Sequence, residues 1–224
     1  MKRAIIDSRP YVLLSLLFGI SYFFVFVLNE PELPDPLKML WKGAGVGFLA
    51  IYALRRVRGF EGRLIAVVMA FGALGDMLIE LDLILGAGAF LIGHCFAIIL
   101  YLRHRRPETA FSQKLFAILL VPITVFVAWS LPFDRAEAPG IAIYTAFLAV
   151  MAATAWTSEF PRYRVGIGAL LFIISDLFIF SRSGFLQNSV IPDWTVWPIY
   201  YVGQFLIATG VVRALRHKWN AVNP

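Results

Sequence analysis

Two aspartates lie inside segments that are otherwise apolar enough to cross a membrane. Asp76 lies in Phe71-Gly-Ala-Leu-Gly-Asp-Met-Leu-Ile-Glu80, and Asp176 ends the run Gly168-Ala-Leu-Leu-Phe-Ile-Ile-Ser-Asp176. An ionised carboxylate near the bilayer centre costs at least ~2.5 kcal/mol, so intramembrane acids usually face a bundle interior or a wet cavity. Two carboxyls in a low-dielectric cavity suit general acid–base catalysis, because one can stay protonated near neutral pH while its partner is ionised. We therefore predict that Asp76 and Asp176 are the catalytic residues.

Other polar residues lie at a similar depth in the predicted helices. Counting ~1.5 Å per residue places each of them ~7 to 15 Å from the same face of the membrane. They are Lys42, His94, Tyr144, Tyr201 and Gln204. Ser175 precedes Asp176, and Glu80 lies one helical turn from Asp76 on the same face. A shared depth predicts one cavity, open toward the non-cytoplasmic side, that these side chains line.

Each of these residues also has a purely structural interpretation. A single histidine such as His94 can be a hydrogen-bonded packing residue, and the tyrosines and Gln204 can join neighbouring helices. Lys42 is close enough to the interface to snorkel, and Glu80 can be solvated at a helix end. The aspartates themselves can be buried acids paired with Lys42 or a tyrosine.

The composition predicts an integral membrane protein. Of the 224 residues, 60% are hydrophobic, and the mean hydropathy is +0.77. Soluble domains have only about 45 to 50% apolar residues. The formal net charge of +6 is therefore interpreted as membrane topology, and we expect no nucleic-acid partner.

Eight apolar segments of about 20 residues predict an all-α, polytopic protein with eight transmembrane helices. They are 10–28, 37–54, 63–82, 86–102, 114–131, 139–157, 164–182 and 194–213. Glycines on three of these segments predict close helix packing: Gly43, Gly45, Gly47, Gly72, Gly75, Gly166 and Gly168.

Basic residues alternate with acidic loops along the chain. The basic groups are Lys2, Arg3 and Arg9, then Arg55, Arg56, Arg58 and Arg63, then Arg103, Arg105, Arg106 and Lys114, then Arg162 and Arg164, then Arg213, Arg216 and Lys218. The opposite loops carry Glu30, Glu32, Asp35, Glu80, Asp82, Asp134, Glu137 and Asp193. The positive-inside rule then places both termini in the cytoplasm. The short loops predict a single membrane domain over 1–224 and are typical of a bacterial inner-membrane protein.

Several reaction classes lack their motifs here. The sequence has no G-x-S-x-G, no H-E-x-x-H, no P-loop and only one cysteine, Cys95. Three histidines, two of them in basic loops, cannot build a multi-histidine zinc site. We expect neither a metal nor another cofactor.

The polar motifs, taken in order, resemble the YhhN-like lysoplasmalogenase family. The resemblance rests on Lys42 to Ala53, the Gly-Asp pair ending at Asp76, Phe90-Leu-Ile-Gly-His94 with Tyr101, Tyr144 with Met151, the run from Gly168 to Asp176, and Tyr201 with Gln204 and Leu206. It spans nearly the whole chain.

The resemblance implies an ether hydrolase that needs no cofactor. Its substrates would be lysoplasmalogens, single-chain lysophospholipids whose vinyl ether is hydrolysed to a fatty aldehyde and glycerophosphoethanolamine or glycerophosphocholine. Vinyl ethers hydrolyse in acid through protonation of the β-carbon, which agrees with a pair of carboxyl groups. Lys42 would meet the phosphate. The supporting residues would be Glu80, His94, Tyr144, Ser175, Tyr201 and Gln204.

A different class of protein also fits two intramembrane acids. A small transporter or channel could use Asp76 and Asp176 as a proton or cation relay. Its expected mark would be an internal repeat, and the Gly-Ala-Leu runs at Gly72 and Gly168 hint at one, although their spacings to the aspartates differ. A structural membrane subunit is a third possibility, but it would not explain the two acids.

Overall fold

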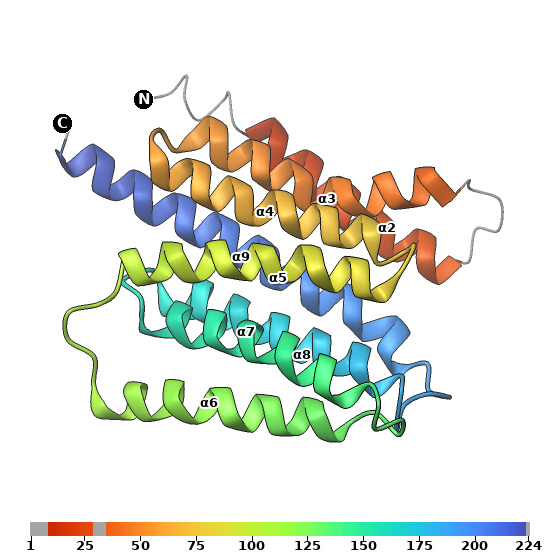
Figure 1. Ribbon diagram of the computed structural model, residues 1–224. Coiled ribbons are helices and arrows are strands. Elements are labelled where there is room, and N and C mark those ends of the chain that lie inside the picture. The colour runs from red at the N-terminus through yellow and green to blue at the C-terminus, as the bar shows by residue number, and fades with distance from the viewer. Residues whose placement is uncertain (1–8, 29–34, 223–224) are drawn as a thin grey trace. The chain divides into compact units, whose positions relative to one another are not determined.

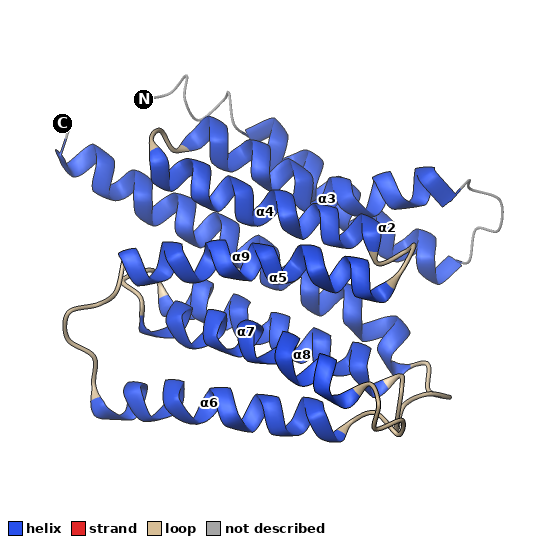
Figure 2. Ribbon diagram, in the orientation of Figure 1, coloured by secondary structure: helices blue, strands red, loops and turns tan. Residues whose placement is uncertain are grey.

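The computed structural model describes residues 9–28 and 35–222. Within these ranges the chain forms eight α-helices, one short π-helix and no strand (Figure 1, Figure 2). They are α2 (Arg9–Leu28), α3 (Asp35–Arg56), α4 (Phe60–Leu78), α5 (Leu83–Arg103), α6 (Phe111–Ser130), α7 (Ala138–Thr157), η1 (Arg162–Gly166), α8 (Ile167–Ser181) and α9 (Ile191–Val222). Every predicted apolar segment overlaps one of these helices, so the all-α prediction is confirmed.

Six helices in the described part of the chain are long and apolar enough to cross a membrane. They are Pro36–Arg56, Leu83–Arg103, Phe111–Ser130, Ala138–Thr157, Arg162–Ser181 and Ile191–Asn220. A shorter apolar helix covers Pro10–Val25. Helix α4 is not among these six because it carries three charged residues, Glu61, Arg63 and Asp76. The eight spans and the cytoplasmic termini stay predictions, and Lys2, Arg3, Glu30 and Glu32 of the topology argument lie outside the described residues.

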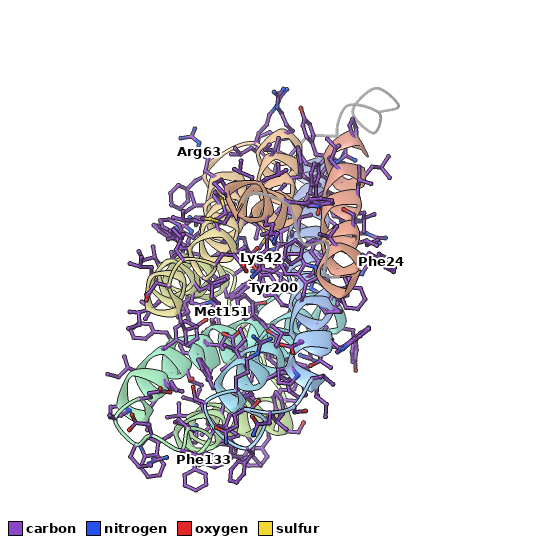
Figure 3. All side chains as sticks on the ribbon, turned by 90° about the vertical axis from the view of Figure 1, so that its right-hand side faces the viewer. Phe24, Lys42, Arg63, Phe133, Met151 and Tyr200 are labelled. Atoms are coloured by element: carbon purple, nitrogen blue, oxygen red, sulfur yellow. The ribbon has the colours of Figure 1, made fainter. Side chains whose placement is uncertain are left out.

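Many large apolar side chains are exposed, as expected for a surface in contact with lipid. Helix α6 carries Phe111, Ile118 and Phe126, which are 79%, 68% and 67% exposed. Figure 3 shows Phe24 and Phe133 directed away from the helices, and each is 54% exposed. Soluble monomers rarely expose so much contiguous apolar surface. A multi-pass membrane protein is the class that these helices indicate.

Contacts along the chain define two compact units. The first comprises residues 1–100 and 208–224, and the second comprises 101–207. Helix α5 therefore belongs almost wholly to the first unit, while α9 contributes its first half to the second unit and its second half to the first. The single domain over 1–224 stays a prediction.

In the first unit, α2 packs against α3 and α3 against α4 (Figure 1). Two of the glycines that were predicted to allow close helix packing lie at such contacts. A Cβ on Gly43 would lie 2.6 Å from Met77 of α4, and a Cβ on Gly75 would lie 2.7 Å from the Phe90 ring of α5. The Phe71 and Phe96 rings stack at 5.9 Å between the same two helices, α4 and α5. Small residues thus bring α3, α4 and α5 together next to Asp76.

In the second unit, α7 packs against α6, η1 and α8. The backbones of α8 and α9 cross closely, because a Cβ on Gly168 would lie 2.7 Å from the Gly203 carbonyl oxygen. Likewise, a Cβ on Gly203 would lie 2.8 Å from the Gly168 carbonyl oxygen. This crossing holds Asp176 of α8 and Gln204 of α9 on neighbouring helices.

Two helix ends differ from the prediction by more than three residues. Helix α4 ends at Leu78, four residues before the predicted end at 82, because Asp82 Oδ1 accepts a hydrogen bond of 2.9 Å from the Leu85 amide and caps α5. Asp76 is therefore two residues from the end of its helix, not six, and Glu80 lies in the turn that follows. Helix α9 continues to Val222 instead of 213, because the residues that follow 213 include the good helix formers Ala214, Leu215 and Arg216.

Candidate active site

Asp76 is buried near the end of α4, with an exposed fraction of 2%. The preceding residue, Gly75, has no side chain, and this absence lets the Phe90 ring pack directly on the α4 backbone. Asp76 also interacts electrostatically with the hydroxyl of Tyr22 on α2. Asp76 therefore belongs to a polar group formed by α2, α3 and α4.

Lys42, Glu80 and Tyr22 form the rest of this group. The Lys42 ammonium makes an ion pair with Glu80 Oε1, and the Tyr22 hydroxyl donates a long hydrogen bond of 3.5 Å to the same oxygen. Lys42 also lies 5.7 Å from the centre of the Tyr22 ring, within cation–π range. Figure 3 shows Lys42 among the helices, in contrast to Phe24. We name Tyr22, Lys42, Asp76 and Glu80 the lysine cluster.

His94 is buried on α5 in the same unit, at 4% exposed. Within the described residues, no group of three or more His, Cys, Asp or Glu residues could hold a metal ion. His94 remains a predicted supporting residue, and its role as a donor or acceptor stays a prediction.

Asp176 is the centre of the polar group in the second unit. The Tyr144 hydroxyl of α7 donates a hydrogen bond of 2.7 Å to Asp176 Oδ2. Ser175 Oγ lies 3.3 Å from Oδ1 and donates a shorter bond of 2.8 Å to the Phe172 carbonyl. All three polar residues, Asp176, Tyr144 and Ser175, are buried, at 5%, 7% and 0% exposed. The carboxyl is thus positioned at both of its oxygens.

An aromatic side chain of α9, Tyr200, packs against the helix that carries Asp176. Gln204 donates a hydrogen bond of 3.3 Å to the Tyr200 hydroxyl, and the Tyr200 ring packs edge-on against Phe172 at 5.1 Å. Trp197 stacks on Tyr201 at 6.0 Å. Because Phe172 and Asp176 are one turn apart on α8, we include Gln204, Tyr200 and Tyr201 with Asp176, Tyr144 and Ser175 and name the set the tyrosine cluster.

The structure joins some of the predicted site residues directly. Lys42 pairs with Glu80, and Tyr144 and Ser175 contact Asp176. Asp76 interacts with Tyr22 of the lysine cluster, and Gln204 is linked to α8 indirectly, through Tyr200 and Phe172. The cavity predicted to be lined by all of them stays a prediction, and so do their catalytic and binding roles.

Two tyrosines in these clusters were not predicted. Tyr200 precedes Gln204 by one helical turn, so the i, i+4 spacing on one helix was a usable signal. Tyr22 meets Glu80 across 58 residues of sequence, and no local pattern indicates such a pair. The packing of α2 against α3 brings Tyr22 to Lys42 and Glu80, and this packing cannot be inferred from either helix alone.

Comparison with known proteins gives one match. The model of the YhhN family matches residues 37–211, which is well over half of the chain and includes every site residue named above except Tyr22. No curated protein and no solved structure matches. The matched region, with its two buried aspartates on apolar helices, shows that this chain belongs to the YhhN family.

Proposed function

We propose that this protein is a lysoplasmalogenase, which hydrolyses the vinyl ether bond of lysoplasmalogens. The observation that carries the proposal is the buried Asp176 carboxyl, which accepts a 2.7 Å hydrogen bond from Tyr144 and has Ser175 at its other oxygen. A second buried acid, Asp76, interacts electrostatically with Tyr22, whose hydroxyl also binds Glu80 of the Lys42–Glu80 ion pair. Membership of the YhhN family supports a hydrolase of this kind.

The chemistry of the bond explains why carboxyl groups suit it. A vinyl ether resists base, but a proton added to its β-carbon gives an oxocarbenium ion. Water then attacks the carbon that bears the oxygen, and the resulting hemiacetal collapses to a fatty aldehyde and a free glycerol hydroxyl. The reaction consumes one water, and it needs one proton donor and one carboxylate to stabilise the cation and accept the proton of the water.

We assign the proton donor to Asp176. The single hydroxyl proton of Ser175 is used in the shorter bond to the Phe172 carbonyl, at 2.8 Å. A proton on Asp176 Oδ1 would turn the 3.3 Å contact with Ser175 Oγ into a hydrogen bond donated by the carboxyl. Tyr144, which donates to Oδ2, leaves Oδ1 as the oxygen that carries the proton.

Asp76 then takes the role of the carboxylate. It would stabilise the oxocarbenium ion and accept a proton from the attacking water. On collapse of the hemiacetal, Asp76 would pass that proton to the glycerol oxygen while the hemiacetal hydroxyl reprotonates Asp176. His94, Tyr201 and Gln204 would orient the carboxyls or the water, and the charge of Lys42 would attract the lipid phosphate.

The test is aldehyde release by the purified protein in detergent. A lysoplasmalogen and the matching ester-linked lysophospholipid are compared, and we expect aldehyde from the vinyl ether alone. In D2O the aldehyde should carry one deuterium on the carbon next to the carbonyl, because the new C–H bond takes its proton from solvent through Asp176. Asp76→Asn and Asp176→Asn should each lower turnover at least ~100-fold.

Asp82→Asn is the matched control. Asp82 is an exposed acid in the turn after α4, and asparagine caps a helix about as well as aspartate. Its turnover should therefore equal that of the unchanged protein. Monodisperse protein that releases no aldehyde would refute the proposal, and proton flux into liposomes would then test the relay interpretation of the two aspartates.

A further inference from the structure

Glu80 is held through only one of its carboxylate oxygens. Lys42 and Tyr22 both bind Oε1, and among the described residues no hydrogen bond is made to Oε2. The Glu80 side chain is 36% exposed, whereas that of Lys42 is 15% exposed. Glu80 is thus anchored at one oxygen and accessible at the other.

The residues beside this pair keep Lys42 in place. Trp41, the residue before Lys42, donates a 2.9 Å hydrogen bond to Ser21 Oγ on α2. The Trp41 ring also packs edge-on against Phe18 at 6.5 Å. Neighbouring residues of α2 and α3 are therefore joined twice, by Trp41 with Ser21 and by Lys42 with Tyr22. A charge pair held in this way has a defined direction, from the ammonium to the carboxylate.

The pair lies one turn along the chain from Asp76. Four residues separate Asp76 from Glu80, and both acids interact with the Tyr22 hydroxyl, Glu80 through the hydrogen bond to Oε1 and Asp76 electrostatically. A lipid whose vinyl ether lies at Asp76 would therefore have its head group near Lys42 and Glu80. The following inference rests on the proposed function, because it places the reacting bond at Asp76.

We propose that Lys42 and Glu80 recognise the zwitterionic head group of the lipid, with the phosphate beside Lys42 and the ammonium beside Glu80 Oε2. The two charge pairs then lie head to tail, so that each charge faces an opposite one. A primary ammonium donates a charge-assisted hydrogen bond to the carboxylate, while a quaternary ammonium contributes its charge alone. A head group that ends at the phosphate is attracted by the Lys42 charge but repelled by the Glu80 carboxylate. This repulsion provides the specificity for a zwitterionic head group over a bare phosphate.

Binding measured without catalysis tests this proposal separately from the reaction. The probes are lysolipids with an alkyl ether in place of the vinyl ether, carrying ethanolamine, choline or bare phosphate head groups, added to the full chain in detergent. We expect the order ethanolamine, choline, phosphate for the unchanged protein. In Glu80→Gln the preference for ethanolamine over phosphate should fall by about tenfold, the usual weight of one charge-assisted hydrogen bond.

Three further variants separate recognition from a structural tether. Glu80→Asp keeps the charge and should keep the order, and Asp82→Asn should leave it unchanged. The exchange of Lys42→Glu with Glu80→Lys preserves an ion pair between α3 and the turn after α4 but reverses its direction. This exchange should abolish the preference for ethanolamine while the protein stays folded.

The outcomes are distinct. If Glu80→Gln weakens all three probes equally, or only lowers thermal stability, the recognition proposal is wrong even though aldehyde release continues. Retention of the ethanolamine preference in the exchanged pair would also overturn it. Selective binding that is lost in Glu80→Gln, in a protein that releases no aldehyde, would refute the hydrolase proposal and leave lipid recognition supported.

Discussion

Tyr144 donates a hydrogen bond of 2.7 Å to Asp176 across 32 residues of sequence, from α7 to α8. The bond is buried, so its loss would remove a polar contact from an apolar environment, where such contacts are costly to lose. The Tyr144 ring also packs edge-on against Phe180 at 5.8 Å. The Tyr144 hydroxyl thus helps to orient the proposed acid, Asp176, while the Tyr144 ring packs against Phe180.

Tyr144→Phe separates these two roles. The variant keeps the ring contact with Phe180 and removes only the donor, so the protein should fold. Aldehyde release should fall at least about tenfold, because the bond stabilises the carboxylate that Asp176 becomes when it gives up its proton, and hydrogen bonds to charged groups contribute ~1.5 to 3 kcal/mol. Steady-state kinetics with a lysoplasmalogen checks this. Tyr163→Phe is the control, because Tyr163 is 79% exposed, and its kinetics should be unchanged. Equal rates for the two variants would contradict a role for Tyr144.

Combining the two aspartate variants tests whether Asp76 and Asp176 act in the same reaction. Residues that act as a unit are strongly non-additive, because the loss of either one already removes the catalytic route. We therefore expect Asp76→Asn with Asp176→Asn to be no slower than the slower single variant, within about threefold. The measurement is kcat/KM for all four proteins of the cycle. Multiplication of the two single effects would show that the carboxyls act independently.

Gly75→Ala should destabilise the first unit. The new Cβ would lie 2.7 Å from the Phe90 ring, which must move or be compressed. Overpacking of this kind costs ~1 to 3 kcal/mol, and thermal unfolding in detergent measures it. Gly88→Ala on α5 is the control, since nothing lies within 4 Å of the added Cβ, and alanine is the better helix former. Phe90→Leu combined with Gly75→Ala should restore part of the loss; no recovery would place the strain elsewhere.

Gly168→Ala should be more damaging than Gly75→Ala. Its Cβ would meet the Gly203 carbonyl oxygen at 2.7 Å, and a backbone atom cannot rotate away as a ring can. Helices α8 and α9 would have to separate, and Asp176 would shift relative to Gln204. Misplacement of a catalytic group by about 1 Å can cost ~100-fold in rate. We expect low turnover as well as low stability, with Gly140→Ala, which has nothing within 4 Å, unchanged in both.

The helices could be predicted from the sequence because hydropathy and backbone chemistry determine them locally. In a bilayer each spanning segment must satisfy its own backbone hydrogen bonds, so an apolar run such as 139–157 has little choice but to be a helix, and the structure has Ala138–Thr157. The predicted end of α4 was wrong by four residues, because the N-terminal cap of α5 ends the preceding helix earlier than the apolar pattern does. Asp82, which looked like one more acid at a helix end, binds the Leu85 amide and begins α5.

Some of the site residues could likewise be identified from the sequence, whereas their partners could not. Asp76 and Asp176 stood out in the sequence because a carboxylate in an apolar run is costly whatever surrounds it. Their partners depended on packing: Tyr22 reaches Glu80 across 58 residues and Tyr144 reaches Asp176 across 32. Helices in lipid associate through close contact of small residues and a few hydrogen bonds, which no single segment encodes. The sequence by itself determined which residues were polar in an apolar chain, and only the tertiary structure decided which of them meet.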